Sequence, residues 1–319
     1  MTATTIIAIG ELLVEFVSHQ EGCKLLNLAE YSGPYPSGAP AICIDQAARL
    51  GAITQIFGTV GDDNFGKALT DRLIANGVGT TGISSVAGKT TAVAFVSYFR
   101  DGERTFIFHL NNTAADTIDA RSITLPDTPV IMHVSGSSLG NPHLRNTIES
   151  VAAQVIEHGG KISCDPNARP ELMGDPVVMT SLRQLIEHSS FLFPSDDDLA
   201  HLYPDKSISE AIDTLLAGGA DTIALTQGKR GSTIFSHSHK PLILAGHKVD
   251  ETDPTGAGDC YCGTFLAMAV AGNPIEKCGQ YANAAGAMAV TKRGPMEGNS
   301  FLSDIETFLR NNPAIARDK

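Results

Sequence analysis

The stretch Asp253-Pro254-Thr255-Gly256-Ala257-Gly258-Asp259 carries the clearest chemical signal in this chain. Three small residues precede Asp259, and an apolar helical pattern follows. Small residues let backbone N–H groups approach an anion, and a helix N-terminus adds a favourable dipole. A carboxylate beside a bound phosphate is placed to take a proton from an attacking hydroxyl. The stretch therefore predicts a phosphoryl-transfer site; the alternative is a Gly-rich loop in which Asp259 only caps the helix.

Around this stretch, apolar β-branched runs alternate with helical patterns. Such alternation predicts a three-layer α/β/α fold with a mainly parallel sheet. Ligands bind at the carboxyl ends of such strands, where Asp165, Ser195 and Thr226 fall. The predicted strands are 4–9, 53–60, 130–134, 161–164, 191–193 and 222–225. The predicted helices are 39–50, 62–77, 142–157, 176–188, 195–203, 207–217, 257–271, 274–291 and 301–311.

Two regions interrupt the alternation: residues 11–36 and a β-rich pair of segments further along the chain. Residues 91–99 and 105–110 are β-rich and are joined by a short polar turn, which predicts a hairpin. We expect a single domain over 1–319, with a small β lid inserted from about 11–36 and 88–113. An exposed lid sheet has edges and an apolar face, and therefore predicts a homodimer through the lid.

Composition excludes several classes of protein. The net charge of −12 argues against a nucleic-acid-binding surface. We expect no signal peptide and no membrane span. The six cysteines form no C-x-x-C pair, which favours reduced thiols in a cytoplasmic protein. Cys260-Tyr261-Cys262 and His237-Ser238-His239 could be metal ligands, but core thiols and an exposed hairpin are the favoured interpretations.

Two further loops carry chemistry. The stretch Thr226-Gln227-Gly228-Lys229-Arg230-Gly231 follows a strand and is either a second phosphate-facing loop or a hairpin turn. It is not a P-loop, and no G-x-G-x-x-G follows the first strand. In Asp165-Pro166-Asn167-Ala168-Arg169-Pro170, two prolines restrict Arg169, which suits a phosphate or carboxylate. The alternative is a surface arginine in a Pro-rich turn.

Together these motifs resemble the ribokinase-like (PfkB-type) family of carbohydrate kinases over essentially the whole chain, nearest to its ketohexose and 2-keto-3-deoxygluconate kinases. The matching segments are Gly10–Glu15, Ser37–Ala41, Gly58–Gly66, Asp253–Asp259 and Asn283–Gly286. The sequence departs from the family where Ser37 replaces the first Gly of the sugar-binding turn and Ile42 stands in place of Asn.

The resemblance implies roles for the nucleotide side of the site. Asp259 would deprotonate a sugar hydroxyl, and backbone N–H groups of Gly256, Ala257 and Gly258 would form the anion hole. The residues implied to bind ATP, apart from those glycines, are Asp165, Arg169, Ser195, Thr226, Gly228, Gly231 and Asn283.

The resemblance also implies ions. Mg²⁺ would accompany ATP, with Asp198 acting through water. A monovalent cation would lie near Asp253 and Thr255, and Gly294 is a further candidate for this site. K⁺ is the candidate ion.

On the sugar side, the resemblance assigns Gly38 and Ala39 to the sugar-binding turn, with Arg169 and Asp259 also facing the substrate. Alternation makes Glu11 and Glu15 point to the same side, where they accept hydrogen bonds from sugar hydroxyls. At the end of the lid hairpin, His109 and Leu110 replace a Tyr-Arg pair. His109 could serve a neutral sugar, and Leu110 disfavours a sugar acid.

We therefore expect ATP-dependent phosphorylation of a primary hydroxyl on a ketohexose such as tagatose or fructose. The runner-up substrate is 2-keto-3-deoxygluconate. A nucleoside is disfavoured because the sequence suggests no aromatic pair to stack on a base. A non-catalytic sugar or nucleotide sensor on the same fold is the contrasting class, and retention of Asp259 argues against it.

Overall fold

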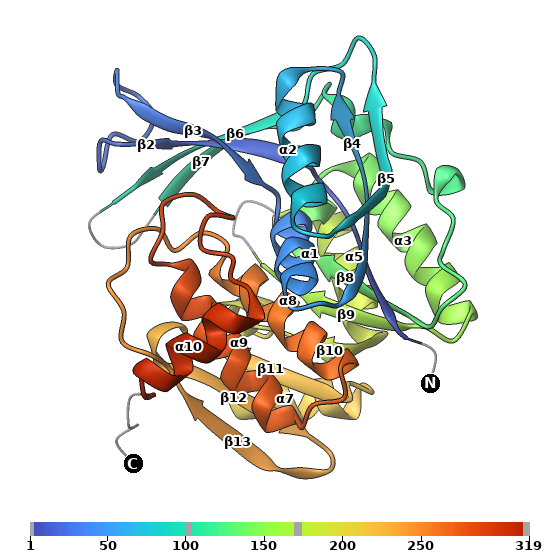
Figure 1. Ribbon diagram of the computed structural model, residues 1–319. Coiled ribbons are helices and arrows are strands. Elements are labelled where there is room, and N and C mark those ends of the chain that lie inside the picture. Colours follow the sequence, from blue (N-terminus) through green and yellow to red (C-terminus); the bar gives the residue numbers. More distant parts are fainter. Residues whose placement is uncertain (1–2, 100–103, 169–173, 315–319) are drawn as a thin grey trace.

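The computed structural model describes residues 3–99, 104–168 and 174–314. Its main feature is a sheet in the order β13-β12-β11-β10-β9-β8-β1-β4-β5 (Figure 1). The strands from β5 to β11 in that order are parallel, and β12 and β13 join antiparallel. The strand bounds are β1 Thr5–Ile9, β4 Ile53–Gly61, β5 Gly79–Val86, β8 Val130–Ser135, β9 Lys161–Asp165, β10 Ser189–Leu192, β11 Thr222–Thr226, β12 Gly231–Ser236 and β13 His239–Ala245. The predicted mainly parallel sheet is confirmed.

Helices cover both faces of this sheet (Figure 1). In β1, Ile6 and Ala8 join one hydrophobic cluster and Ile7 and Ile9 join the other, as the two-residue period of a strand requires. The first cluster contains α1 (Ala39–Arg49), α2 (Asn64–Ala75), α8 (Ala257–Val270) and α9 (Ile275–Ala289). The second contains α3 (Pro142–Glu157), α5 (Pro176–Glu187), α6 (Asp196–Leu202) and α7 (Ile208–Ala217). Helix α10 (Leu302–Asn311) packs against α9.

A second, four-stranded sheet stands off the first (Figure 1). Its order is β3-β2-β6-β7, with bounds β2 Leu13–Ser18, β3 Tyr31–Ser37, β6 Ala92–Tyr98 and β7 Arg104–His109. All four strands come from the segments expected to form the lid, and we call this sheet the lid sheet.

Three strands of the main sheet, β5, β12 and β13, are not among the predicted strands, although the hairpin favoured for residues 237–239 is confirmed where β12 meets β13. Strand β5 is an edge strand of small and polar residues, so it lacks the apolar run that marks an interior strand. Strands β12 and β13 form a hairpin with β11, and Thr226 pairs with Ser232 across the turn. The stretch from Thr226 to Gly231 is thus the hairpin turn that the sequence left as an alternative.

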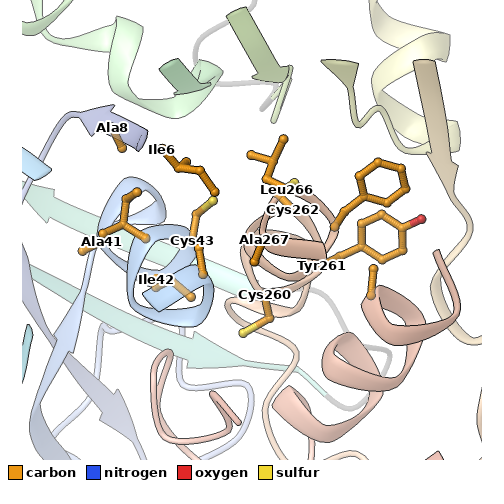
Figure 2. Close-up of a cluster of buried hydrophobic side chains, with 14 of the residues drawn as sticks. Ile6, Ala8, Ala41, Ile42, Cys43, Cys260, Tyr261, Cys262, Leu266 and Ala267 are labelled. Atoms are coloured by element: carbon orange, nitrogen blue, oxygen red, sulfur yellow. The ribbon is translucent and has the colours of Figure 1, made fainter. Parts of the chain in front are cut away.

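Helix α8 is buried on every side. Each residue from Asp259 to Met268 is buried, which explains why the segment has no polar face. Figure 2 shows α8 beside α1, with Cys43 and Cys262 in the same cluster. At Gly263 the two backbones approach so closely that a Cβ would lie 2.2 Å from the carbonyl oxygen of Cys43. Helix α8, which begins within the stretch from Asp253 to Asp259, therefore has little freedom to shift.

No helix among the described residues is long and apolar enough to cross a membrane.

Candidate active site

A cleft of about 780 Å³ lies between the lid sheet and the carboxyl ends of the main-sheet strands. Its walls bring together residues that are far apart in the sequence. From the body of the protein come Asp165, Ser195, Thr226, Gly256, Gly258 and Asp259. From the lid sheet and the segments next to it come Glu11, Glu15, Arg104, Phe106 and Phe108. Gly38 and Ala39 also line it.

The loop before α8 is shaped by Gly256. Its φ of 84° is left-handed, and a Cβ there would lie 2.4 Å from the carbonyl oxygen of Pro295. Only glycine satisfies both constraints. Gly256 is the N-cap of α8, so the N–H groups that follow it belong to the first helical turn and lack intrahelical acceptors. This arrangement favours an anion in the cleft. We call residues 254–258 the anion loop.

Asp259 is the third residue of α8; it is 8 % exposed and lines the cleft. The helix behind it is apolar and thiol-rich. Burial, and then the Asp259 charge, raise the pKa of the Cys43 and Cys260 thiols. These thiols stay protonated at neutral pH. The Asp259 carboxylate lines the cleft and is a group suited to accept a proton there.

One other predicted residue, Asp165, lies close to this loop. A Cβ on Gly258 would lie 3.9 Å from Oδ2 of Asp165, and Oδ1 of Asp165 accepts a hydrogen bond from the N–H of Asn167 at 3.0 Å. Ser195 and Thr226 form a parallel β-bridge. The ends of β9, β10 and β11 thus gather Asp165, Ser195 and Thr226 on one side of the cleft, as expected for open α/β sheets.

Asp198 has a structural task that the sequence did not reveal. Its Oδ2 accepts hydrogen bonds from the backbone N–H of Ser195 at 2.7 Å and from the Ser195 hydroxyl at 2.6 Å. Its Oδ1 accepts from the N–H of Ala168 at 2.6 Å. This capping box starts α6 and also fixes the loop after β9.

The sugar side of the cleft is built around two buried carboxylates. Glu11 accepts hydrogen bonds from Ser138 at 2.5 Å and from Ser137 at 3.5 Å. Glu15 accepts from Ser37 at 3.4 Å, so the hydroxyl that replaces the family's glycine orients this carboxylate. Gly38 has a φ of 111°, and a Cβ there would lie 2.3 Å from the carbonyl oxygen of Glu11.

The second departure from the family is also explained by packing. Ile42 is 2 % exposed and lines the cleft. Its Cγ2 would lie 3.3 Å from a Cβ on Gly256. An apolar side chain therefore supports the anion loop where the family has a polar one.

His109 does not line the cleft, and this expectation requires correction. His109 pairs with Val93, while its neighbour Phe108 pairs with Ala94, so the two side chains point to opposite faces of the lid sheet. The His109 ring lies against Phe95 on the outer face. Leu110 lies on the cleft side, as the next alternating position.

The sequence interpretation missed three residues of the inner lid face: Arg104, Phe106 and Phe108. Phe106 and Phe108 stack with centroids 5.1 Å apart, and the Arg104 guanidinium lies over the Phe106 ring at 5.5 Å. The cleft therefore contains an aromatic pair that the sequence did not suggest. The alternation that placed Glu11 and Glu15 on one side could have found these residues in the hairpin.

Several predicted nucleotide ligands lie outside the cleft. Gly228 and Gly231 form the β11–β12 turn, where a Cβ on Gly231 would lie 2.2 Å from the Leu244 carbonyl oxygen. Asn283 donates to the carbonyl oxygens of Leu244 and Ala245, both at 3.3 Å, and so joins α9 to β13. Arg169 lies outside the described residues.

Asp253 lies directly behind the anion loop and is fully buried. Its carboxylate accepts from the N–H of Thr255 at 3.0 Å, from the N–H of Gly294 at 2.9 Å and from the hydroxyl of Tyr98. Burial, and then the Asp253 charge, raise the pKa of Tyr98, so the phenol remains a donor. The Tyr98 hydroxyl also pairs with that of Thr255.

The donor set of the cleft suits hard cations. Asp165, Asp197 and Asp198 line it with carboxylates, and oxygen ligands are those that Mg²⁺ prefers. In the part of the chain that the structure describes, no three His, Cys, Asp or Glu side chains form a metal-binding group.

The chain matches the family model described as pfkB family carbohydrate kinase over residues 3–301. It is 31 % identical to "Probable fructokinase-3" of Arabidopsis thaliana, across 96 % of this chain and 91 % of the relative. A crystal structure of a "putative Ribokinase II" from E. coli in complex with ATP and Mg²⁺ superposes with a TM-score of 0.90 at 38 % identity, covering 97 % of this chain and 99 % of that one.

A fructokinase double mutant from Vibrio cholerae O395, in a form with bound fructose, ADP and potassium ion, has a TM-score of 0.85 at 26 % identity. It matches 97 % of this chain and 99 % of that one.

Proposed function

The chain belongs to the pfkB family of carbohydrate kinases, and from this premise we propose that it transfers the terminal phosphoryl group of ATP to a primary hydroxyl of a ketohexose such as fructose or tagatose. The observation that carries the proposal is the position of Asp259. It is a buried carboxylate in the first turn of α8, and it shares one cleft with the anion loop and with Glu11 and Glu15.

We assign three roles to the residues of the cleft: binding of the acceptor, proton transfer and stabilisation of negative charge. Glu11 and Glu15 accept hydrogen bonds from sugar hydroxyls and orient the acceptor. Asp259 takes the proton of the attacking sugar hydroxyl while the hydroxyl oxygen bonds to the γ-phosphorus and the bond from that phosphorus to ADP breaks. The N–H groups of Gly256, Ala257 and Gly258 donate to the negative charge that builds up on the transferred group.

ATP and Mg²⁺ are the co-substrate and ion we propose, and the bound ligands of the E. coli relative support them. Mg²⁺ would be held near Asp165 and Asp198 through water, and it would neutralise phosphate charge. We assign a K⁺ site to the loop that contains Asp253 and Thr255, close to Gly294, supported by the potassium-bound fructokinase of Vibrio cholerae.

Fructose is the first candidate among acceptors because relatives named fructokinase match nearly the whole chain. Arg104 in the cleft supports 2-keto-3-deoxygluconate as the second candidate, since a guanidinium binds a carboxylate. The stacked Phe106 and Phe108 offer a flat apolar surface, so a ribonucleoside belongs in the same assay.

One substrate panel decides between these acceptors. We expect ADP release with fructose or tagatose at a kcat/KM at least about tenfold above that for 2-keto-3-deoxygluconate or a nucleoside. Phosphorylation of the sugar acid alone would overturn the ketohexose assignment. In that case Arg104→Gln should raise the KM for the acid by about tenfold or more, because the variant leaves a carboxylate unpaired. ATP binding without turnover of any acceptor would indicate a sensor.

The proposal extends to the assembly and its setting. We propose one kinase domain over the chain, with the lid sheet closing on the acceptor. A second copy of the chain would pair with the outer lid face, where Phe16 stacks on Phe95, Tyr31 meets Phe95 edge-on, and Ile107 is 44 % exposed. The free cysteines favour a reducing compartment, the cytoplasm.

A further inference from the structure

The lid sheet contacts the anion loop through Tyr98, the last residue of β6. Its hydroxyl donates to Oδ1 of Asp253 and pairs with the hydroxyl of Thr255. Because the phenol uses its one proton in the hydrogen bond to Asp253, its oxygen accepts the second hydrogen bond and the Thr255 hydroxyl is the donor. One lid side chain is therefore fastened at two points of the segment that leads into Gly256.

Asp253 extends this contact to a third segment. The same carboxylate accepts from the N–H of Thr255 and from the N–H of Gly294, and it is fully buried. Hydrogen bonds to a buried charge are stronger than those between neutral groups. The lid, the anion loop and the loop at Gly294 thus share one acceptor.

A second lid tyrosine, Tyr35, packs against the loop at Gly294. A Cβ on Gly294 would lie 2.7 Å from a ring carbon of Tyr35, so the ring packs directly against the glycine. The next residue, Pro295, supplies the carbonyl oxygen that excludes a side chain from Gly256. The lid therefore reaches Gly256 by two routes: through Asp253 and Thr255, and through Gly294 and Pro295.

We infer that Tyr98 is a positioning residue that couples closure of the lid over the acceptor to the geometry of the anion loop. When the lid is closed, the phenol holds Asp253 and Thr255, and this fixes the direction of the N–H groups that follow. When the lid is open, the loop loses that restraint. Phosphoryl transfer is then favoured only with an acceptor enclosed, which limits transfer to water. This inference rests on the proposed function.

The test compares Tyr98→Phe with Tyr31→Phe, which removes a hydroxyl from another lid tyrosine whose ring contacts Phe95. We expect Tyr98→Phe to lower kcat for the sugar by about ten- to a hundredfold, the range for a hydrogen bond to a charged group. The KM for ATP should change by less than about twofold, because no contact to the nucleotide is lost. The ratio of ATP hydrolysed to sugar phosphorylated should rise, and Tyr31→Phe should match the wild type in all three.

A second readout does not depend on activity. In hydrogen–deuterium exchange on the free protein, Tyr98→Phe should speed exchange at amides 253–258 relative to Tyr31→Phe, with an unchanged unfolding midpoint. If exchange is faster in Tyr98→Phe but the wild-type protein phosphorylates no sugar, the proposed function is contradicted while the coupling between the lid and the anion loop is supported. Unchanged exchange and a kcat within about twofold of wild type would overturn the coupling. A loss of activity that merely parallels a lower unfolding midpoint would also overturn it.

Discussion

Among single residues, Gly256 carries the strictest steric demand in the cleft. Its left-handed φ and the Pro295 carbonyl oxygen both exclude a side chain. Gly51 offers a matched comparison, because its φ is 85° and a Cβ added there would meet no atom within 4 Å. The two glycines therefore separate the cost of backbone strain from the cost of a clash.

We predict that Gly256→Ala destabilises the fold more than Gly51→Ala does. Both variants lose about 1–2 kcal/mol to a left-handed alanine, and Gly256→Ala loses about 1–3 kcal/mol more to the clash. Its kcat should also fall by about tenfold or more, because the anion-loop amides shift. Urea unfolding and steady-state kinetics measure both effects. Equal destabilisation in the two variants, with normal kcat for Gly256→Ala, would contradict this assignment.

For single residues, the sequence predicts the chemistry of a side chain better than it predicts the groups that the side chain contacts. The spacing of Gly256, Gly258 and Asp259 is enough to predict an anion loop. Asn283 could not be placed in the same way, because its partners are the backbone of β13, 38 and 39 residues away. Asp198 was expected only near Mg²⁺, yet both its oxygens hold backbone groups.

At the scale of elements, periodicity explains both what was predicted and what was missed. The helices that the structure describes and the parallel interior strands carry apolar patterns that the sequence shows directly. Strand β5 was missed because an edge strand buries little and needs few apolar residues. In the lid hairpin the strands were expected but their faces were not. His109 and Leu110 were considered together, although neighbours in a strand point to opposite sides.

For the whole molecule, the outer lid face is where a second copy should bind. We predict a particle of twice the 33.6 kDa chain mass in light scattering. Ile107→Lys should yield monomers, because burying a charge in an apolar interface is costly. Ile243→Lys, at a 64 % exposed isoleucine on the edge strand β13, should stay dimeric. Dimers that survive Ile107→Lys, or a monomeric wild type, would exclude the lid as the interface.

The proposed phosphoryl transfer depends above all on Asp259, which removes the proton from the acceptor hydroxyl. The most direct measurement is the rate of sugar phosphorylation by Asp259→Asn, with Asp250→Asn, at an exposed position upstream, as the control. We predict that Asp259→Asn lowers kcat by at least about a hundredfold, the typical contribution of a general base. ATP should still bind, and Asp250→Asn should retain the wild-type rate. An Asp259→Asn enzyme that keeps more than about a tenth of the wild-type kcat would contradict the role of Asp259 as the base.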